Sequence, residues 1–133
     1  MAVTTIINFG HPLSPRVKSH LAPCKEVRAA LQLDLDHEPT PPQVVKAVDR
    51  LFEDLQRQGV RTDGTAALVV VLPGLTEATA VILAELHGRL GGFPRVLALR
   101  KRKDDGTYGL FADSAGLGVL DLEQVRLEAR GRR

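Results

Sequence analysis

Residues 65–72 form the segment that most constrains the fold of this chain. The run reads Thr-Ala-Ala-Leu-Val-Val-Val-Leu, and Pro73 and Gly74 end it. Its β-branched content and its length predict a strand. Its apolar residues fall on both strand faces, which predicts a central strand covered on each side. The run therefore indicates a sheet with a layer of structure on both faces.

Strand-like and helix-like patterns alternate along the rest of the chain. The expected order is strand 3–9, helix 15–22, strand 26–33, helix 41–58, strand 65–72, helix 77–90, strand 95–100, strand 108–112 and helix 122–130. Alternation of this kind implies a parallel sheet with right-handed crossovers. Asp105-Gly106 is a hairpin turn signal between the last two strands. We therefore predict a single α/β domain over residues 1–133. It is Rossmann-like, with a mainly parallel sheet flanked by helices, a C-terminal antiparallel β-hairpin and a final helix.

Capping signals mark where the helices begin. Ser14 precedes Pro15, Thr40 stands three residues before Gln43, and Thr76 and Asp121 precede the last two helices. Side-chain oxygens at these positions accept hydrogen bonds from the first free N–H groups of a helix. Residues 77–90 are apolar around much of the helix, so we expect that helix to be buried against the sheet or a second subunit.

Composition narrows the function classes. The chain has 133 residues, a net charge of +2 and one cysteine, Cys24. One cysteine forms no internal disulfide and no cysteine-based zinc site. A charge this near to neutral argues against tight binding to long nucleic acid. Aromatic residues are scarce, which argues against a stacking platform for single strands. We find no secretory signal and no membrane-spanning run, and we expect a cytoplasmic protein.

Two loops are candidate binding sites. In open α/β sheets, ligands bind beyond the carboxyl ends of the strands, near the N-termini of helices. The loop 8–14 follows the first strand, and the loop 72–76 follows the central strand. Asn8, His11, Ser14 and Thr76 offer groups for a phosphate or a base edge, although such residues also occur at turns without a ligand. Neither loop has the glycine spacing of a dinucleotide or triphosphate site.

Other polar residues give weaker signals. Glu85 and Arg89 have the spacing of a surface ion pair on one helix. Arg100 begins a basic run, which indicates either a solvated strand edge or a contact with a phosphate. The four histidines lack the spacing of a metal site. No residue pattern identifies a catalytic group, and no cofactor is indicated. An RNA ligand can still be cleaved by orientation alone, because a ribose 2′-OH that is held in line can attack its own phosphate.

Two motifs carry a resemblance to a known family. Asn-Phe-Gly-His-Pro-Leu-Ser stands at residues 8–14, and Ala-Glu-Leu-His-Gly-Arg-Leu-Gly-Gly-Phe-Pro stands at residues 84–94. The chain resembles a family of small accessory proteins from type III CRISPR loci, of about this length. Residues 34–42, which are acidic and proline-rich and are expected to form a loop, and the C-terminal hairpin carry little of the resemblance.

The resemblance implies a fold and a ligand. It implies a domain like the CRISPR-associated Rossmann-fold (CARF) sensor domains, which dimerise and bind cyclic oligoadenylate across a two-fold axis. Small relatives lower the concentration of this messenger by cleaving or sequestering it. Carried over to this chain, the resemblance places phosphate or adenine near a set of seven residues, namely Asn8, Gly10, His11, Ser14, Gly74, Thr76 and Arg89.

Three functions stay open at this point. We expect a homo-oligomer that binds cyclic tetra-adenylate and sequesters it, which would damp type III signalling. A metal-independent ring nuclease with the same pocket is the second possibility. A protein-interaction module with no nucleotide ligand is the third.

Overall fold

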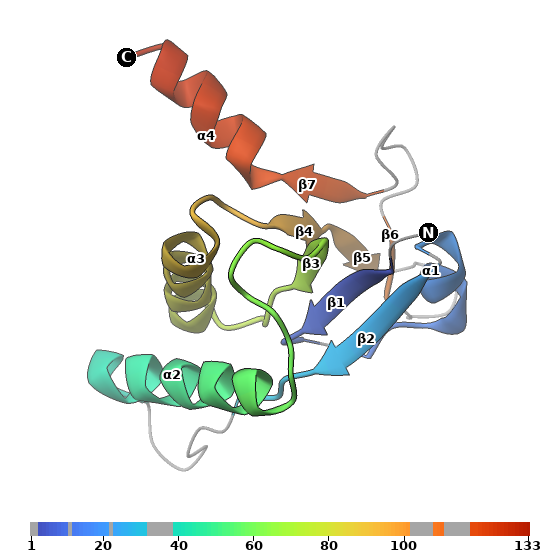
Figure 1. The fold of residues 1–133 in the computed structure, drawn as a ribbon, viewed down its shortest axis with the longest axis horizontal. Coiled ribbons are helices and arrows are strands. Elements are labelled where there is room, and N and C mark those ends of the chain that lie inside the picture. Colours follow the sequence, from blue (N-terminus) through green and yellow to red (C-terminus); the bar gives the residue numbers. More distant parts are fainter. Residues whose placement is uncertain (1–2, 11, 22, 32–38, 102–107, 111–117) are drawn as a thin grey trace.

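Strands and helices alternate in the computed structural model of the chain (Figure 1). The structure describes residues 3–10, 12–21, 23–31, 39–101, 108–110 and 118–133. Its elements are β1 (Thr4–Asn8), α1 (Pro15–His20), β2 (Cys24–Arg28), α2 (Pro41–Arg57), β3 (Leu68–Val71), α3 (Thr76–Leu90), β4 (Arg95–Leu97), β5 (Leu99–Lys101), β6 (Tyr108–Leu110), β7 (Val119–Asp121) and α4 (Leu122–Gly131). The predicted α/β class is confirmed.

The main sheet contains five strands in the order β2-β1-β3-β4-β7. The first four strands of that order run parallel, and β7 is antiparallel to β4. From β1 the chain passes through α1 to β2 at one edge. It then crosses back through α2 to β3 on the other side of β1. The direction in which the sheet is built therefore reverses between β1 and β3.

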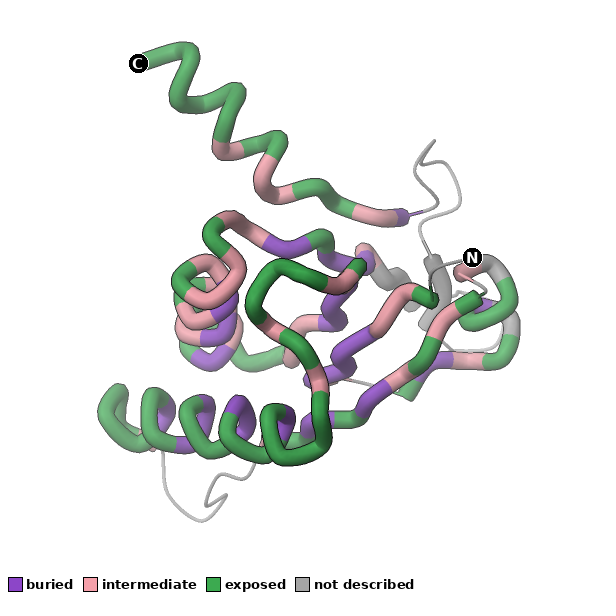
Figure 2. Tube along the Cα trace, viewed as in Figure 1, coloured by how far each residue is buried: buried purple, intermediate pink, exposed green. Residues whose placement is uncertain are grey.

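Two apolar clusters cover the two faces of this sheet. Figure 2 shows that buried positions follow the central strands and recur along α2 and α3. Ile7 and Val70 face α2 and α3 in the larger cluster. Ile6 and Val69 face the smaller cluster, to which Val17 of α1 belongs. Neighbouring residues of a strand point to opposite faces, so β1 and β3 bury both of their faces. The prediction of a central, doubly covered strand is confirmed for β3.

The helices begin at the predicted capping residues, with one exception. Ser14 and Asp121 accept hydrogen bonds from the backbone N–H groups of Val17 and Gln124, and Thr40 forms a full capping box with Gln43. The prediction that Thr76 caps α3 is wrong. Thr76 is the first helical residue, and the cap position belongs to Leu75, whose side chain cannot accept a hydrogen bond.

The strand predictions for the C-terminal part of the chain are only partly correct. The strand expected over 95–100 divides at Ala98, because β4 pairs inside the main sheet while β5 pairs with β6. The β5–β6 pair is antiparallel, as expected, although the Asp-Gly turn lies outside the described residues. β7 was not predicted. It has three residues, and a run this short carries too little alternation to be recognised in the sequence.

Candidate functional site

The candidate site lies at the carboxyl ends of β1 and β3, where the sheet reverses direction. Backbone hydrogen bonds hold the segments after these strands together. The N–H of Phe9 donates to the carbonyl of Val71 at 2.9 Å, and the N–H of Ala29 donates to the carbonyl of Asn8 at 2.9 Å. The residues that follow β1, β2 and β3 therefore meet at one edge of the sheet.

Asn8 is buried at this edge, with 1 % of its surface exposed. Its Oδ1 accepts a hydrogen bond from the N–H of Gly10 at 2.9 Å, and its Nδ2 donates to Oε2 of Glu26 at 2.8 Å. Hydrogen bonding of both ends fixes the orientation of the amide. The structure thus gives Asn8 a role in shaping the loop after β1.

Glu26 of β2 is the partner that sequence reasoning missed. Its side chain is 14 % exposed, and its Oε1 lies 3.1 Å from Nζ of Lys18 in α1. Burial tends to raise the pKa of this carboxyl. Hydrogen bonds from Asn8 and Lys18, together with the positive charges of Lys18 and Arg28, outweigh burial and lower the pKa. Glu26 is therefore ionised at neutral pH.

The sequence does contain a signal for the role of Glu26, because Glu26 and Arg28 alternate with apolar residues along a strand. Both residues occupy even positions of β2, on the same side as Asn8 of the neighbouring strand. The predicted strand 26–33 contained both residues, but β2 spans Cys24–Arg28 and the sequence alone did not show its register with β1.

Gly10 sits where the two candidate loops touch. An added Cβ at Gly10 would lie 2.6 Å from the carbonyl oxygen of Leu72, a distance that real Cβ atoms do not reach. The carbonyl of Gly10 accepts a hydrogen bond from Nη2 of Arg28 at 3.5 Å. Glycine is therefore required here because the backbone of the loop after β3 approaches so closely.

The N-terminus of α3 presents backbone N–H groups without a side-chain cap. Gly74 and Thr76 are exposed next to it, and an added Cβ at Gly74 would meet nothing within 4 Å. Thr79 ties the start of the helix to the preceding loop, because its hydroxyl donates to the carbonyl of Pro73 at 3.0 Å. Uncapped helix N-termini favour anions, although Glu77 already places one negative charge in the first turn.

Four of the eight predicted site residues flank this reversal in the sheet directly, and Ser14 follows at the start of α1. Those four are Asn8, Gly10, Gly74 and Thr76. Arg89 is not brought to them. It lies in the last turn of α3 and lines a cavity with residues 59–63, which lead into the amino end of β3. His11 lies outside the described residues, as does the side chain of Arg100, whose backbone pairs with Gly109 in β5–β6.

Arg89 makes structural contacts at its own end of the molecule. Its Nε lies 3.3 Å from Oε2 of Glu85, and its guanidinium carbon lies 4.9 Å from the centre of the Phe52 ring. The predicted Glu85–Arg89 ion pair is confirmed. Cation–π contact with Phe52 of α2 adds a link between the two helices that the sequence did not indicate.

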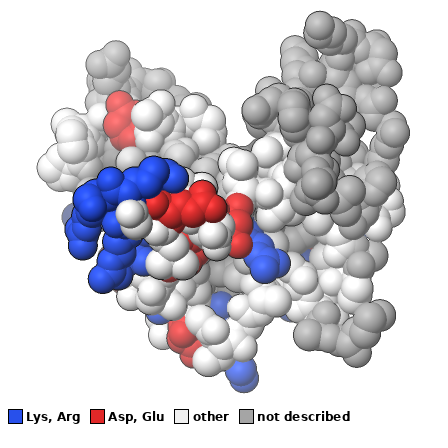
Figure 3. Space-filling view, turned by 90° about the horizontal axis from the view of Figure 1, so that it is seen from above, with Lys and Arg blue, Asp and Glu red and all other residues white. Residues whose placement is uncertain are grey.

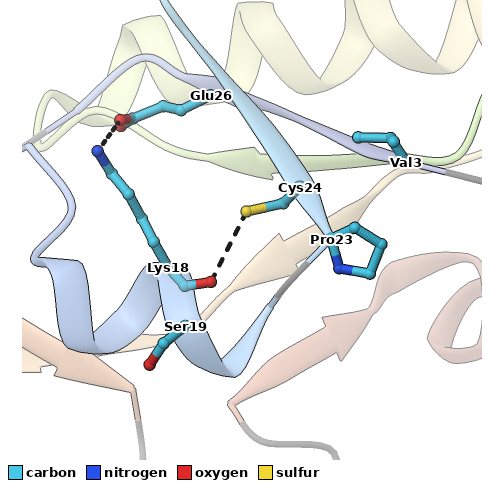
Figure 4. A pocket seen from close by; sticks show the side chains of 6 residues that line it. All are labelled: Val3, Lys18, Ser19, Pro23, Cys24 and Glu26. Carbon is cyan, nitrogen blue, oxygen red and sulfur yellow. Dashed lines mark hydrogen bonds and ion pairs between the residues drawn. The ribbon is translucent and has the colours of Figure 1, made fainter.

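A cavity of about 640 Å³ lies between α1 and β2, and Lys18 and Glu26 help to line it (Figure 4). Its lining residues are Val3, Lys18, Ser19, Pro23, Cys24 and Glu26. The thiol of Cys24 lies 3.7 Å from the carbonyl of Lys18. Lys18 spans this cavity from the helix to the strand, so its charge is already paired with Glu26.

Basic side chains gather on the face that shows β7 and α4. Figure 3 looks down on this face and shows them beside acidic side chains at the end where α4 lies. The α4 segment supplies Arg126 and Arg130, and Nη1 of Arg126 pairs with Glu123 at 3.1 Å. The charge of Arg126 is therefore partly neutralised within α4.

The described residues contain no candidate metal site and no candidate membrane-spanning helix. Within them, no three His, Cys, Asp or Glu side chains lie close enough to share a metal ion. None of their helices has the length and apolar character needed to cross a bilayer. Comparison with known proteins adds no relative, since no family model, curated protein or solved structure matches the chain.

Proposed function

We propose that this chain is a Rossmann-like, CARF-like domain that binds cyclic oligoadenylate, with cyclic tetra-adenylate as the preferred ring. One observation carries the proposal. The sheet reverses direction between β1 and β3, where Phe9, just after β1, bonds to the last residue of β3 and Gly10 lies against the carbonyl of Leu72. Ligands of open α/β sheets bind at such reversal points, beyond the carboxyl ends of the strands.

The groups at this edge suit the phosphates of a small ring. The free N–H groups at the start of α3 attract an anion, and Gly74 leaves room for close approach. Ser14 adds a hydroxyl at the start of α1. Because these donors are few, they favour a ligand with a few phosphates over a long polynucleotide.

Sequestration is favoured over cleavage by the state of Glu26, the carboxylate that is bonded to Asn8 at this edge. Both carboxylate oxygens of Glu26 accept bonds from neighbouring side chains, and its pKa is lowered. A carboxylate held in this way is a poor proton acceptor at neutral pH. The proposed role is therefore to hold the messenger and so to damp type III CRISPR signalling.

The proposal includes self-association. A ring with two-fold symmetry presents the same surface twice, and two copies of one half-site match it. One protomer of 14.4 kDa then supplies half of the binding surface.

Calorimetry with cyclic tri-, tetra- and hexa-adenylate tests the proposal. We expect saturable heat with the tetramer and intact ring after the protein is denatured and the ligand is chromatographed. Linear products with 2′,3′-cyclic phosphate ends would identify a ring nuclease instead. An absence of heat with all three rings would overturn nucleotide binding and favour a protein-interaction module.

A further inference from the structure

Helix α4 carries an apolar strip that leads out of the core and into solvent. Leu122 begins the strip and packs against the larger apolar cluster. Val125 and Ala129 follow it at spacings of three and seven residues, which places all three on one side of the helix. Val125 and Ala129 are exposed, and no residue of α4 is buried. The strip therefore continues the core surface outward as exposed apolar surface.

The strand that leads into α4 extends this strip. Leu120 of β7 is paired with Val96 of β4, and directly opposed residues of antiparallel strands lie on the same face. Val96 belongs to the larger cluster, so Leu120 lies on the sheet face that α2 and α3 cover, yet it is 49 % exposed. In Figure 1, α4 leads from β7 away from the rest of the molecule. The exposed strip thus runs from Leu120 to Ala129.

Charge changes sign from the start of α4 to its end. Asp121 and Glu123 lie at the start, and Arg130 and Arg132 lie at the end. Glu123 is bonded to Arg126, and a carboxylate has acceptor positions left for a second arginine. The distribution suits the helix dipole within one copy. It also makes the helix complementary to itself, because an antiparallel second copy brings each acidic start against a basic end.

One antiparallel register satisfies the charges and the apolar strip together. With Glu123 opposite Arg130 of a second copy, Asp121 comes opposite Arg132 and Val125 comes beside Ala129. Two-fold symmetry makes each of these contacts occur twice. A second copy of this chain is therefore the occupant that the surface of α4 fits.

We infer that α4 joins two copies of this chain, which pair antiparallel through the strip from Leu120 to Ala129. The inference rests on the proposed function only in that two copies associate, and it names the surface that joins them. The contact needs no nucleotide. A helix of ten residues is about 15 Å long, so the contact is smaller than a standard interface and we expect a micromolar dissociation constant.

Sedimentation velocity of the ligand-free protein tests the contact, with Val125→Glu as the variant and Leu127→Glu as the matched control. The two residues are similarly exposed, at 55 % and 48 %, but lie on opposite sides of the helix. We expect Val125→Glu to raise the dissociation constant of the dimer about tenfold or more, since both copies lose a valine from the contact. We expect Leu127→Glu to stay within about twofold of the parent protein. Thermal melting should show that both variants keep the fold, because both positions are exposed.

A parent protein that stays monomeric at millimolar concentration would overturn the contact, and so would equal dissociation constants for the parent protein and Val125→Glu. Neither result depends on a nucleotide. Calorimetry with the three rings is run separately on the parent protein. Heat from a monomeric protein would sustain nucleotide binding without this contact, whereas a dimer that gives no heat would sustain the contact and end the proposed ligand.

Disulfide trapping tests the antiparallel register. Val125→Cys and Ala129→Cys are made in a Cys24→Ser background, mixed and oxidised. We expect the two different variants to crosslink to each other faster than either crosslinks to itself, because the register places position 125 beside position 129. Crosslinking of each variant mainly to itself would contradict an antiparallel pair.

Discussion

The amide of Asn8 and the carboxylate of Glu26 meet at 2.8 Å, and this bond joins two adjacent strands beneath α1. The same amide holds the N–H of Gly10 through its other end. Lys18 then holds the second oxygen of Glu26 from α1. A polar chain thus runs from α1 through β2 and β1 to the loop that starts the candidate site.

Asn8→Asp should reverse the pH dependence of stability around this bond. The introduced carboxylate would face Glu26 at hydrogen-bond distance, and two like charges this close raise the pKa of one of them. A raised pKa in the folded state means that stability is present at low pH and lost as the pH rises. We expect urea unfolding of the variant to show more stability at pH 5 than at pH 7, unlike the parent protein. A variant that is equally stable at both values would contradict the pairing.

Glu26→Gln should remove a pH dependence that the parent protein has. The folded-state pKa of Glu26 lies below its ordinary value of 4.5, so its contribution is full above that pH and is lost as the pH falls through the folded pKa. We expect the variant to be less stable at pH 7 by about 1–3 kcal/mol, which is the range for a lost charged hydrogen bond. Denaturant midpoints of the two proteins should converge as the pH falls below 4.5. A constant gap would indicate that the charge of Glu26 is not involved.

Gly10→Ala should separate the two candidate loops. The new Cβ would press on the carbonyl oxygen of Leu72, and such overpacking costs about 1–3 kcal/mol. We expect a lower melting temperature and weaker binding of cyclic tetra-adenylate. Gly74→Ala is the control for stability, since its Cβ meets nothing within 4 Å. If both variants melt like the parent protein, the two loops do not touch at Gly10 as described.

Local patterns were enough to predict most of the fold. The capping box of Thr40 and Gln43, the Pro-Gly after β3 and the strong apolar stripe of α2 each act within a few residues. β7 depends instead on pairing with β4, which lies more than twenty residues earlier in the chain. Such long-range pairing leaves no signal in a strand of three residues.

The candidate site was predicted only in part for a related reason. Glycine and helix-start residues mark loops by their local chemistry, so both loops were recognised. Glu26 and Lys18 contribute through contacts that depend on strand register and on the position of α1. Arg89 shows a further limit of local patterns, since a motif in α3 does not show which end of the sheet its residues reach.

Glu77→Gln should tighten anion binding at the start of α3. Glu77 lies in the first turn, where its charge stabilises the helix by about 0.3–1 kcal/mol and repels a phosphate. We expect a small loss of thermal stability together with a gain in affinity of about threefold for cyclic tetra-adenylate. Glu53→Gln on the exposed side of α2 serves as the control and should change the affinity little. Weaker binding by Glu77→Gln would place the phosphate away from this helix end.

Arg89→Ala should lower stability without changing ligand affinity. Its guanidinium lies over the ring of Phe52 and its Nε bonds to Glu85, so its loss should cost about 0.5–2 kcal/mol in urea unfolding. The residue stands with residues 59–63 at the amino end of β3, away from Gly74 and Thr76. We therefore expect calorimetry with cyclic tetra-adenylate to give an affinity within about twofold of the parent protein, since long-range charge effects are screened by salt. A loss of affinity of tenfold or more would move the binding surface to the opposite edge of the sheet, because no contact described above joins Arg89 to the loop after β1.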